Sequence, residues 1–236
     1  MKSIVAALRF LTILSRFTSQ TSNAPMVGKV ATLFPVIGLI LGLFLALVAR
    51  ALENYVDTEI LSTTLVAFLV LATGGLHLEG LQKTFDEPAL RQTATSAGSS
   101  SGAIGVAAIV IVILFKIKSM DILEEKLTIT LLLTPFLARW AMLVFIYGSH
   151  RQSEGDASRI AQNVKFWHVL IATIATLAPV TYLLGRTGLL IALCLSVFSL
   201  VFRALLQKRN SVLTAANLGA LIELSETLSL ILLASL

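Results

Sequence analysis

Apolar stretches separated by short polar ones run almost the whole length of this chain. A helix that crosses a bilayer needs about 20 mostly apolar residues. Seven stretches approach that length, and they are Val30–Val48, Ile60–Leu78, Gly102–Phe115, Leu127–Tyr147, Trp167–Leu184, Thr187–Phe202 and Val212–Leu236. Only Gly185 and Arg186 separate the fifth from the sixth, so these two must form a tight hairpin. The pattern predicts an all-α transmembrane helical bundle, with residues 1–236 as a single integral-membrane domain.

The beginning of the chain has a different pattern. Lys2, Arg9 and Arg16 recur every seven residues, so a helix places them on one face. We expect an amphipathic helix on the membrane surface within residues 1–20, and a frayed tail is the alternative. Arg9 interrupts the apolar run and no small-residue cleavage site follows Arg16, which argues against a secretory signal.

The composition supports the membrane assignment. The chain is 56% hydrophobic and 13% charged, with a mean hydropathy of +0.90, whereas soluble domains carry about 25% charged residues. Its one cysteine, Cys194, excludes an internal disulfide and a site built from several cysteines. The net charge of +5 comes from cations that flank apolar spans. It therefore indicates orientation in a membrane, and we expect no nucleic-acid partner.

Lysines and arginines prefer the cytoplasmic side of a membrane, and their distribution sets the expected topology. With the N-terminus inside, 12 of the 18 fall in inner segments and five in outer segments, Lys116 among the five; Arg139 lies within a span. We expect a multi-pass protein of the cytoplasmic (inner) membrane. We expect its N-terminus to face the cytoplasm, together with residues 74–105. This segment is acidic and rich in Gly and Ser, and it forms a loop after residue 79.

Ionisable residues at the end of the second span are the first candidates for chemistry, because such residues near a bilayer usually have a function. His77 and Glu79 are followed by Asp86 and Glu87. Glu79 and Asp86 are seven residues apart, so a continuing helix would place both on one face. Carboxylate oxygens of this kind bind Mg²⁺. The alternative for His77 is a capping or interface residue.

A second candidate group lies inside the spans. Glu223 and Glu226 are three residues apart and share a helix face. Arg139 lies at a comparable depth on another span and is the obvious cationic partner. Charges within a bilayer need a partner. The three residues are therefore either a structural ion pair that joins two helices or part of a metal or phosphate site.

Small residues mark two further segments. Residues 96–105 are rich in serine and glycine and lead into a helix. The free N–H groups at a helix N-terminus suit a phosphate, although a flexible linker has the same composition. Gly38 and Gly42 are four residues apart within a span, a spacing that favours close packing of two helices.

These segments, in this order, resemble the cobalamin synthase family, also named adenosylcobinamide-GDP ribazoletransferase. The resemblance covers nearly the whole chain and is carried by six short stretches in register. They are Leu8–Thr12 (family pattern LxFLT), Phe34–Leu39 (FPxVGxxxG), Gly75–Leu81 (GLHLDGLADxxDG), Gly102–Val106 (GxxG), Arg139-Trp140 (RW) and Leu218–Glu226 (TGDxLGAxxExxE).

The resemblance implies a Mg²⁺-dependent reaction that joins adenosylcobinamide-GDP to α-ribazole or its 5′-phosphate and releases GMP. Phosphoryl transfer needs metal and cationic stabilisation of spreading negative charge. The family pattern, carried onto this chain, implies three sets of residues. The catalytic set is His77, Glu79, Asp86 and Arg139; the substrate-binding set is Ser99, Gly102, Gly105 and Asn217; the Mg²⁺ ligands are Glu79, Asp86, Glu223 and Glu226.

The chain departs from the family pattern at charged positions. Lys83 replaces the second aspartate, Ala97-Gly98-Ser99-Ser100 replaces Lys-Asp-Ser-Arg, and Thr214-Ala215-Ala216 replaces Thr-Gly-Asp. These changes leave a second hypothesis, a catalytically impaired relative that binds corrinoids or acts as a scaffold subunit of a membrane complex. Beside the corrinoid nucleotide, α-ribazole and the lipid bilayer, the expected partners are a second copy or other cobalamin-assembly enzymes. A transporter is disfavoured because no inverted repeat is evident.

Overall fold

The computed structural model describes residues 27–93, 102–149, 160–208 and 213–236, and all elements in these ranges are helices. The predicted all-α class is therefore confirmed. The predicted surface helix within residues 1–20, together with Ser99, lies outside the described residues. In chain order the helices are α2 (Val27–Thr32), α3 (Phe34–Leu52), α4 (Thr58–Thr73), α5 (Leu76–Thr93), α6 (Ala103–Ile122), the short 3₁₀ helix η3 (Glu124–Lys126), α7 (Leu127–Ile146), α9 (Phe166–Lys208) and α10 (Ala215–Ser235).

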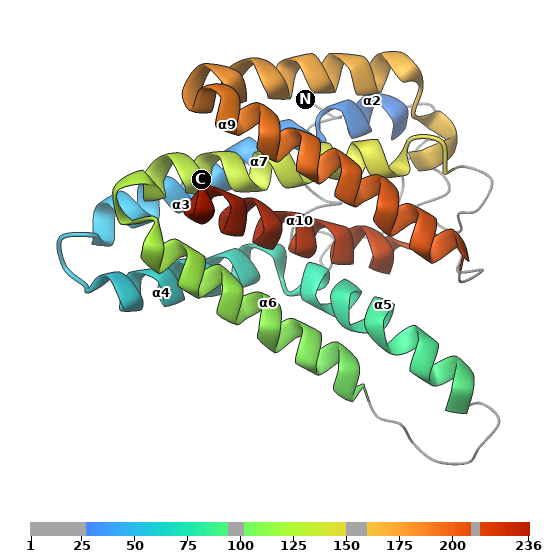
Figure 1. Ribbon diagram of the computed structural model, residues 1–236, viewed down its shortest axis with the longest axis horizontal. Helices are drawn as coiled ribbons and strands as arrows, with labels where there is room; N and C mark the ends of the chain where they lie inside the picture. The colour runs from blue at the N-terminus through green and yellow to red at the C-terminus, as the bar shows by residue number, and fades with distance from the viewer. Residues whose placement is uncertain (1–26, 94–101, 150–159, 209–212) are drawn as a thin grey trace.

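Five of the described helices are long and apolar enough to cross a membrane, and a bent pair formed by α4 and the first part of α5 would make six. Seven spans were expected, and the numbers differ mainly because α9 contains two of them. The chain leaves helical geometry at Gly185 and reverses direction there (Figure 1). Gly188 then packs against Val180 on the preceding leg. The predicted tight hairpin is therefore confirmed, and the protein is a multi-pass membrane bundle.

The second expected span, Ile60–Leu78, is wrong as a single straight helix. Helix α4 ends at Thr73, and α5 begins at Leu76 at an angle of 86° to it. Gly74 and Gly75 make the break because both have positive φ, at 63° and 69°, a conformation that only glycine adopts at no steric cost. The expected loop after residue 79 is also wrong, since α5 continues to Thr93.

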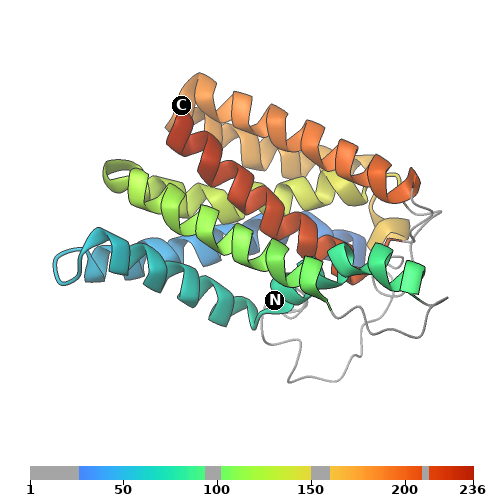
Figure 2. The ribbon, with the colours of Figure 1, turned by 60° about the horizontal axis from the view of Figure 1, so that its bottom comes forward.

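Helix α10 lies in the middle of the bundle, with α7 and α9 on one side and α5 and α6 on the other (Figures 1 and 2). Glycines allow α5 to approach it closely. A Cβ on Gly80 would stand 2.6 Å from the carbonyl oxygen of Ala216, and one on Gly219 would stand 3.2 Å from the Cα of His77. Because α5 meets α10 at backbone distance here, His77 is held directly against α10.

Helices α3 and α7 pack in the same way. A Cβ on Gly38 would clash with the backbone carbonyl of Pro135, and one on Gly42 would reach the backbone of Leu131 and Leu132. The close packing predicted from the Gly38–Gly42 spacing is confirmed. It fixes α7, the helix that carries Arg139, against α3.

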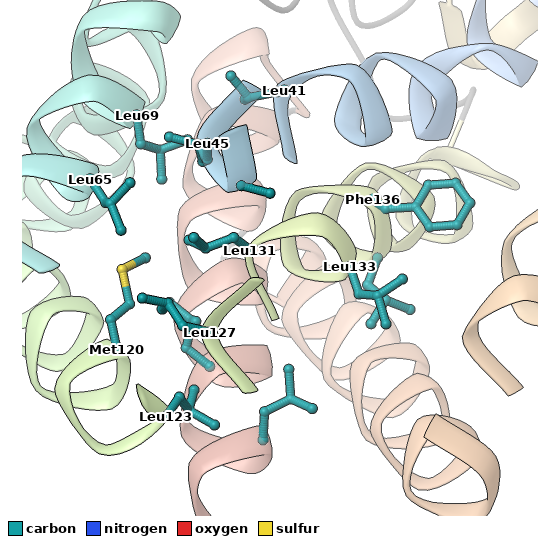
Figure 3. Close-up of a cluster of buried hydrophobic side chains, with 14 of the residues drawn as sticks. Leu41, Leu45, Leu65, Leu69, Met120, Leu123, Leu127, Leu131, Leu133 and Phe136 are labelled. Carbon is teal, nitrogen blue, oxygen red and sulfur yellow. The ribbon is translucent and has the colours of Figure 1, made fainter. Parts of the chain in front are cut away.

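A layer of aliphatic side chains fills the end of the bundle away from α5. Figure 3 shows leucines of α3 and α4 facing Met120 of α6 and the leucines of α7. On the outside, long apolar side chains such as Leu47 and Leu193 are more than half exposed. An apolar exterior of this kind fits contact with lipid. The members labelled in Figure 3 are Leu41, Leu45, Leu65, Leu69, Met120, Leu123, Leu127, Leu131, Leu133 and Phe136.

Candidate functional site

Four charged side chains meet inside the bundle, and we refer to Lys116, Arg139, Glu223 and Glu226 as the charged tetrad. The ammonium of Lys116 donates to Oε2 of Glu223 and to Oε2 of Glu226, each at 2.6 Å. Nη1 of Arg139 donates to the other oxygen of Glu226, Oε1. None of the four side chains is more than 4% exposed. Three helices, α6, α7 and α10, are thus joined through charges.

The charged tetrad lies deep along its helices. Glu223 follows the first residue of α10 by eight positions and Lys116 follows that of α6 by thirteen. At 1.5 Å per residue these are depths of about 12 and 20 Å, well inside a hydrocarbon layer of about 30 Å. Two cations and two carboxylates balance to zero net charge, which reduces the cost of holding charges in such a place. The predicted pairing of Arg139 with this carboxylate pair is confirmed.

Lys116 is the member of the charged tetrad that the sequence pattern does not identify. The sequence pattern predicts an outer loop for it, just after the span Gly102–Phe115, but α6 continues to Ile122 and Lys116 is only 2% exposed. A run of 14 residues is too short to cross a bilayer, which needs about 20, so the helix has to continue past it. The sequence offers one signal, because Val112, Lys116 and Ser119 are spaced as one helix face; the structure shows that all three are buried.

His77 lies beside the charged tetrad. It occupies the first turn of α5, is 4% exposed, and is within electrostatic range of Arg139 and Glu226. Its Nε2 is buried without a hydrogen-bond partner among the described residues, as are Nε and Nη2 of Arg139. Buried polar atoms normally have partners. These nitrogens are therefore suited to form hydrogen bonds with a polar group outside the described residues. For the edge of the Arg139 guanidinium, the favoured group is a phosphate or a carboxylate.

Asp86 holds the start of α6. Its Oδ1 accepts a hydrogen bond from the backbone N–H of Gly105 at 2.8 Å. A Cβ on Gly102 would clash with the Asp86 carboxylate, and one on Gly105 would come within 2.6 Å of it. The anion at this helix N-terminus is thus a carboxylate of the chain itself. Gly102 and Gly105, expected to line the substrate, make room for Asp86 in the structure.

Glu79 and Asn217 also have partners within the chain. Glu79 is exposed and pairs with Lys83, one helical turn later, at 2.6 Å. Asn217 forms a capping box with Thr214 at the start of α10. Its Nδ2 donates to Oγ1 of Thr84 at 3.2 Å, which ties α10 to α5. The structure therefore gives Asn217, an expected substrate ligand, a role in joining two helices.

The four carboxylates expected to hold Mg²⁺ do not form one site. Glu79 is paired with Lys83, Asp86 caps α6, and the other two are held by Lys116. Within the described ranges, no group of three or more His, Cys, Asp or Glu side chains is arranged to hold a metal ion. The residues carried over from the family pattern as metal ligands therefore do not fit a magnesium centre.

Comparison with known proteins gives one consistent result. The family described as cobalamin-5-phosphate synthase matches residues 3–234. Adenosylcobinamide-GDP ribazoletransferase from Syntrophobacter fumaroxidans is 32% identical over 95% of this chain and 94% of its own. The proteins of the same name from Geotalea daltonii and a Thermoanaerobacter species are 30% and 29% identical, each over 98% of this chain and 96% of theirs. No solved structure matches the chain.

Proposed function

This chain belongs to the cobalamin-5-phosphate synthase family, and we propose that it joins adenosylcobinamide-GDP to α-ribazole or its 5′-phosphate with release of GMP. Relatives that the chain matches over 96% of their length are named as transferases, so the reaction class is that of a transferase in cobalamin biosynthesis. The observation that carries the proposal is the open edge of Arg139. Two of its nitrogens are buried and unpaired among the described residues, beside an equally unpaired nitrogen of His77.

The chemistry matches this arrangement. A hydroxyl oxygen of the ribazole attacks phosphorus, the bond from phosphorus to the GMP oxygen breaks, and GMP leaves with the bonding electrons. Negative charge spreads over the phosphoryl oxygens in the transition state. Nε and Nη2 of Arg139 form a planar fork that fits two such oxygens. We assign Nε2 of His77 to the attacking hydroxyl, as the acceptor of its hydrogen bond and then of its proton.

Orientation and partners belong to the same proposal. We propose that the protein lies in the cytoplasmic membrane with its N-terminus and the start of α5 toward the cytoplasm. Because Lys116 is buried in the bundle and not in an outer loop, four cations are left in outer segments, against 12 in inner segments. This strengthens the charge asymmetry that orients membrane proteins. Association with a second copy or with other cobalamin-assembly enzymes stays a prediction.

Magnesium dependence, which the family resemblance implies, also stays a prediction. Bound to the nucleotide, the metal would neutralise phosphate charge. The carboxylates named for it are already paired within the chain, so we assign no residue of this chain to the metal. The charge stabilisation that we do assign to the protein comes from Arg139.

A second candidate function is favoured by two of those pairings. Glu79 is neutralised by Lys83, and Asp86 is used to hold Gly105. Because these carboxylates are paired within the chain, they are not available for catalysis. The second candidate is therefore a protein that binds a corrinoid nucleotide without converting it. This catalytically impaired relative would act as a corrinoid-binding or scaffold subunit of a membrane complex.

One experiment separates the two functions. The full chain in lipid nanodiscs is given adenosylcobinamide-GDP and α-ribazole, and GMP and the corrinoid product are quantified by liquid chromatography. The transferase predicts time-dependent GMP release in equal amount to product. Arg50→Met, at an exposed arginine, should leave the rate unchanged, whereas Arg139→Lys should lower it. Binding of both substrates with no GMP released would reject the transferase in favour of the corrinoid-binding relative.

A further inference from the structure

An ammonium group and a divalent cation compete for the same carboxylate oxygens. In this chain Nζ of Lys116 stands 2.6 Å from Oε2 of Glu223 and 2.6 Å from Oε2 of Glu226. The one remaining oxygen of Glu226 accepts a hydrogen bond from Arg139. Three of the four oxygens in the carboxylate pair are therefore taken by side chains of α6 and α7.

The charge balance argues in the same direction. The charged tetrad is neutral as it stands, and its side chains are at most 4% exposed. A divalent ion added to it would leave an excess of two positive charges in a place with little access to water, and an uncompensated buried charge is strongly unfavourable. Within the described residues, no third acidic or imidazole group is placed to share a metal with the pair.

We infer that Lys116 is the resident counter-ion of the Glu223–Glu226 pair, and that this pair binds no divalent metal. Lys116 also acts as a positioning residue. It orients Glu226, whose second oxygen holds Nη1 of Arg139, so that only Nε and Nη2 of the guanidinium stay available. The inference does not depend on the proposed reaction, because it concerns what the carboxylates bind and how the bundle is held together.

Metal binding tests the first part directly. Mn²⁺, a paramagnetic substitute for Mg²⁺, is titrated into the full chain in nanodiscs, and free Mn²⁺ is measured by electron paramagnetic resonance. Wild type, Glu223→Gln and the charge-balanced Lys116→Met/Glu223→Gln variant should bind the same number of ions, with Kd values within about twofold. Loss of a bound Mn²⁺ in either folded variant would overturn the inference.

Thermal unfolding tests the counter-ion role. Lys116→Met leaves two carboxylates against one arginine, and breaking a buried pair in this way should lower Tm by about 10 °C or prevent folding. Lys116→Met/Glu223→Gln restores the balance and should recover most of that loss. Lys118→Met is the matched control, since Lys118 is exposed on the same helix and pairs with Asp121 at the surface. A Lys116→Met protein as stable as Lys118→Met, or a double variant no better than Lys116→Met, would overturn the assignment.

Discussion

Arg139 meets Glu226 through one nitrogen only. Nη1 of the guanidinium donates to Oε1 of Glu226, while Nε and Nη2 are buried without a partner among the described residues. A carboxylate that held both nitrogens of the fork would close the arginine to any other ligand. The one-sided contact instead orients the guanidinium and leaves its other edge for an anionic group.

Replacing Arg139 should therefore affect turnover more than folding when the charge is compensated. Arg139→Met/Glu226→Gln removes both members of the pair and keeps Lys116 with Glu223. Loss of one donor to the developing phosphoryl charge typically costs about 100-fold in rate or more. We expect GMP release to fall by that factor while Tm, measured by tryptophan fluorescence, stays close to wild type.

Arg139→Lys is the companion variant. A lysine keeps the positive charge and can still reach Glu226, but it lacks the planar pair of donors. We expect Arg139→Lys to release GMP faster than Arg139→Met/Glu226→Gln but more slowly than wild type. A lysine variant with wild-type turnover would show that Arg139 contributes charge alone and that its free edge does not bind the phosphoryl oxygens.

The contact between Asp86 and the start of α6 provides a second prediction. In a helix, glycine to alanine usually stabilises by about 1 kcal/mol. At Gly105 a methyl group would come within 2.6 Å of both the Asp86 carboxylate and Gln82. We expect Gly105→Ala to destabilise by about 1–3 kcal/mol instead, seen as a lower Tm in detergent. Ala107→Gly is the control, at an exposed position on the same helix. It should destabilise by about 1 kcal/mol, which would show that alanine is preferred over glycine in this helix wherever a methyl group has room.

Much of the architecture could be predicted from local pattern. Hydrophobic length identified the spans, the Gly185 break identified the hairpin, and the spacing of Gly38 and Gly42 identified a close helix contact. Two carboxylates three residues apart in an apolar helix required a cation, and Arg139 was the obvious one. Each of these inferences depends on residues that are near one another in sequence or on the cost of burying charge.

The rest depended on contacts between distant residues. Asp86 meets Gly105 across 19 positions and Lys116 meets Glu223 across 107, and no local spacing specifies either partner. Lys116 was misplaced because a lysine after 14 apolar residues has the pattern of a span end. Glu79 was grouped with the other carboxylates by residue type, although a lysine one turn away was enough to pair with it at the surface.

Asn217 gives a third prediction, which separates structure from substrate binding. Its side chain closes the capping box with Thr214 and donates to Thr84 on α5. Asn217 is the N3 member of this box. Loss of its hydrogen bond to the backbone N–H of Thr214 costs about 1 kcal/mol, and loss of the contact with Thr84 adds to this. We expect Asn217→Ala to lower Tm with KM for both substrates unchanged. A raised KM at unchanged Tm would instead support the substrate role that the family pattern implied.

The C-terminal end of α7 gives the last prediction. Arg203, near the end of α9, donates through Nη1 to the carbonyl oxygen of Tyr147 and, at 3.4 Å, to that of Phe145. Phe145 lies in the last turn of α7, and Tyr147 is the C-cap residue of that helix. The last carbonyls of a helix have no intrahelical N–H partner, and the helix dipole is negative at this end. A cation there contributes up to about 2 kcal/mol when partly buried. Arg203→Met should therefore lower Tm by several degrees.

Arg50→Met is the control for Arg203, because Arg50 also lies in the last turn of a helix but is 75% exposed in its pair with Glu53. Exposed pairs of this kind contribute about 0–1 kcal/mol, so its Tm should hardly change. Arg203→Lys should recover part of the loss, since an ammonium can still reach one carbonyl. Equal Tm values for Arg203→Met and Arg50→Met would mean that the α7 terminus is held by packing and not by this arginine.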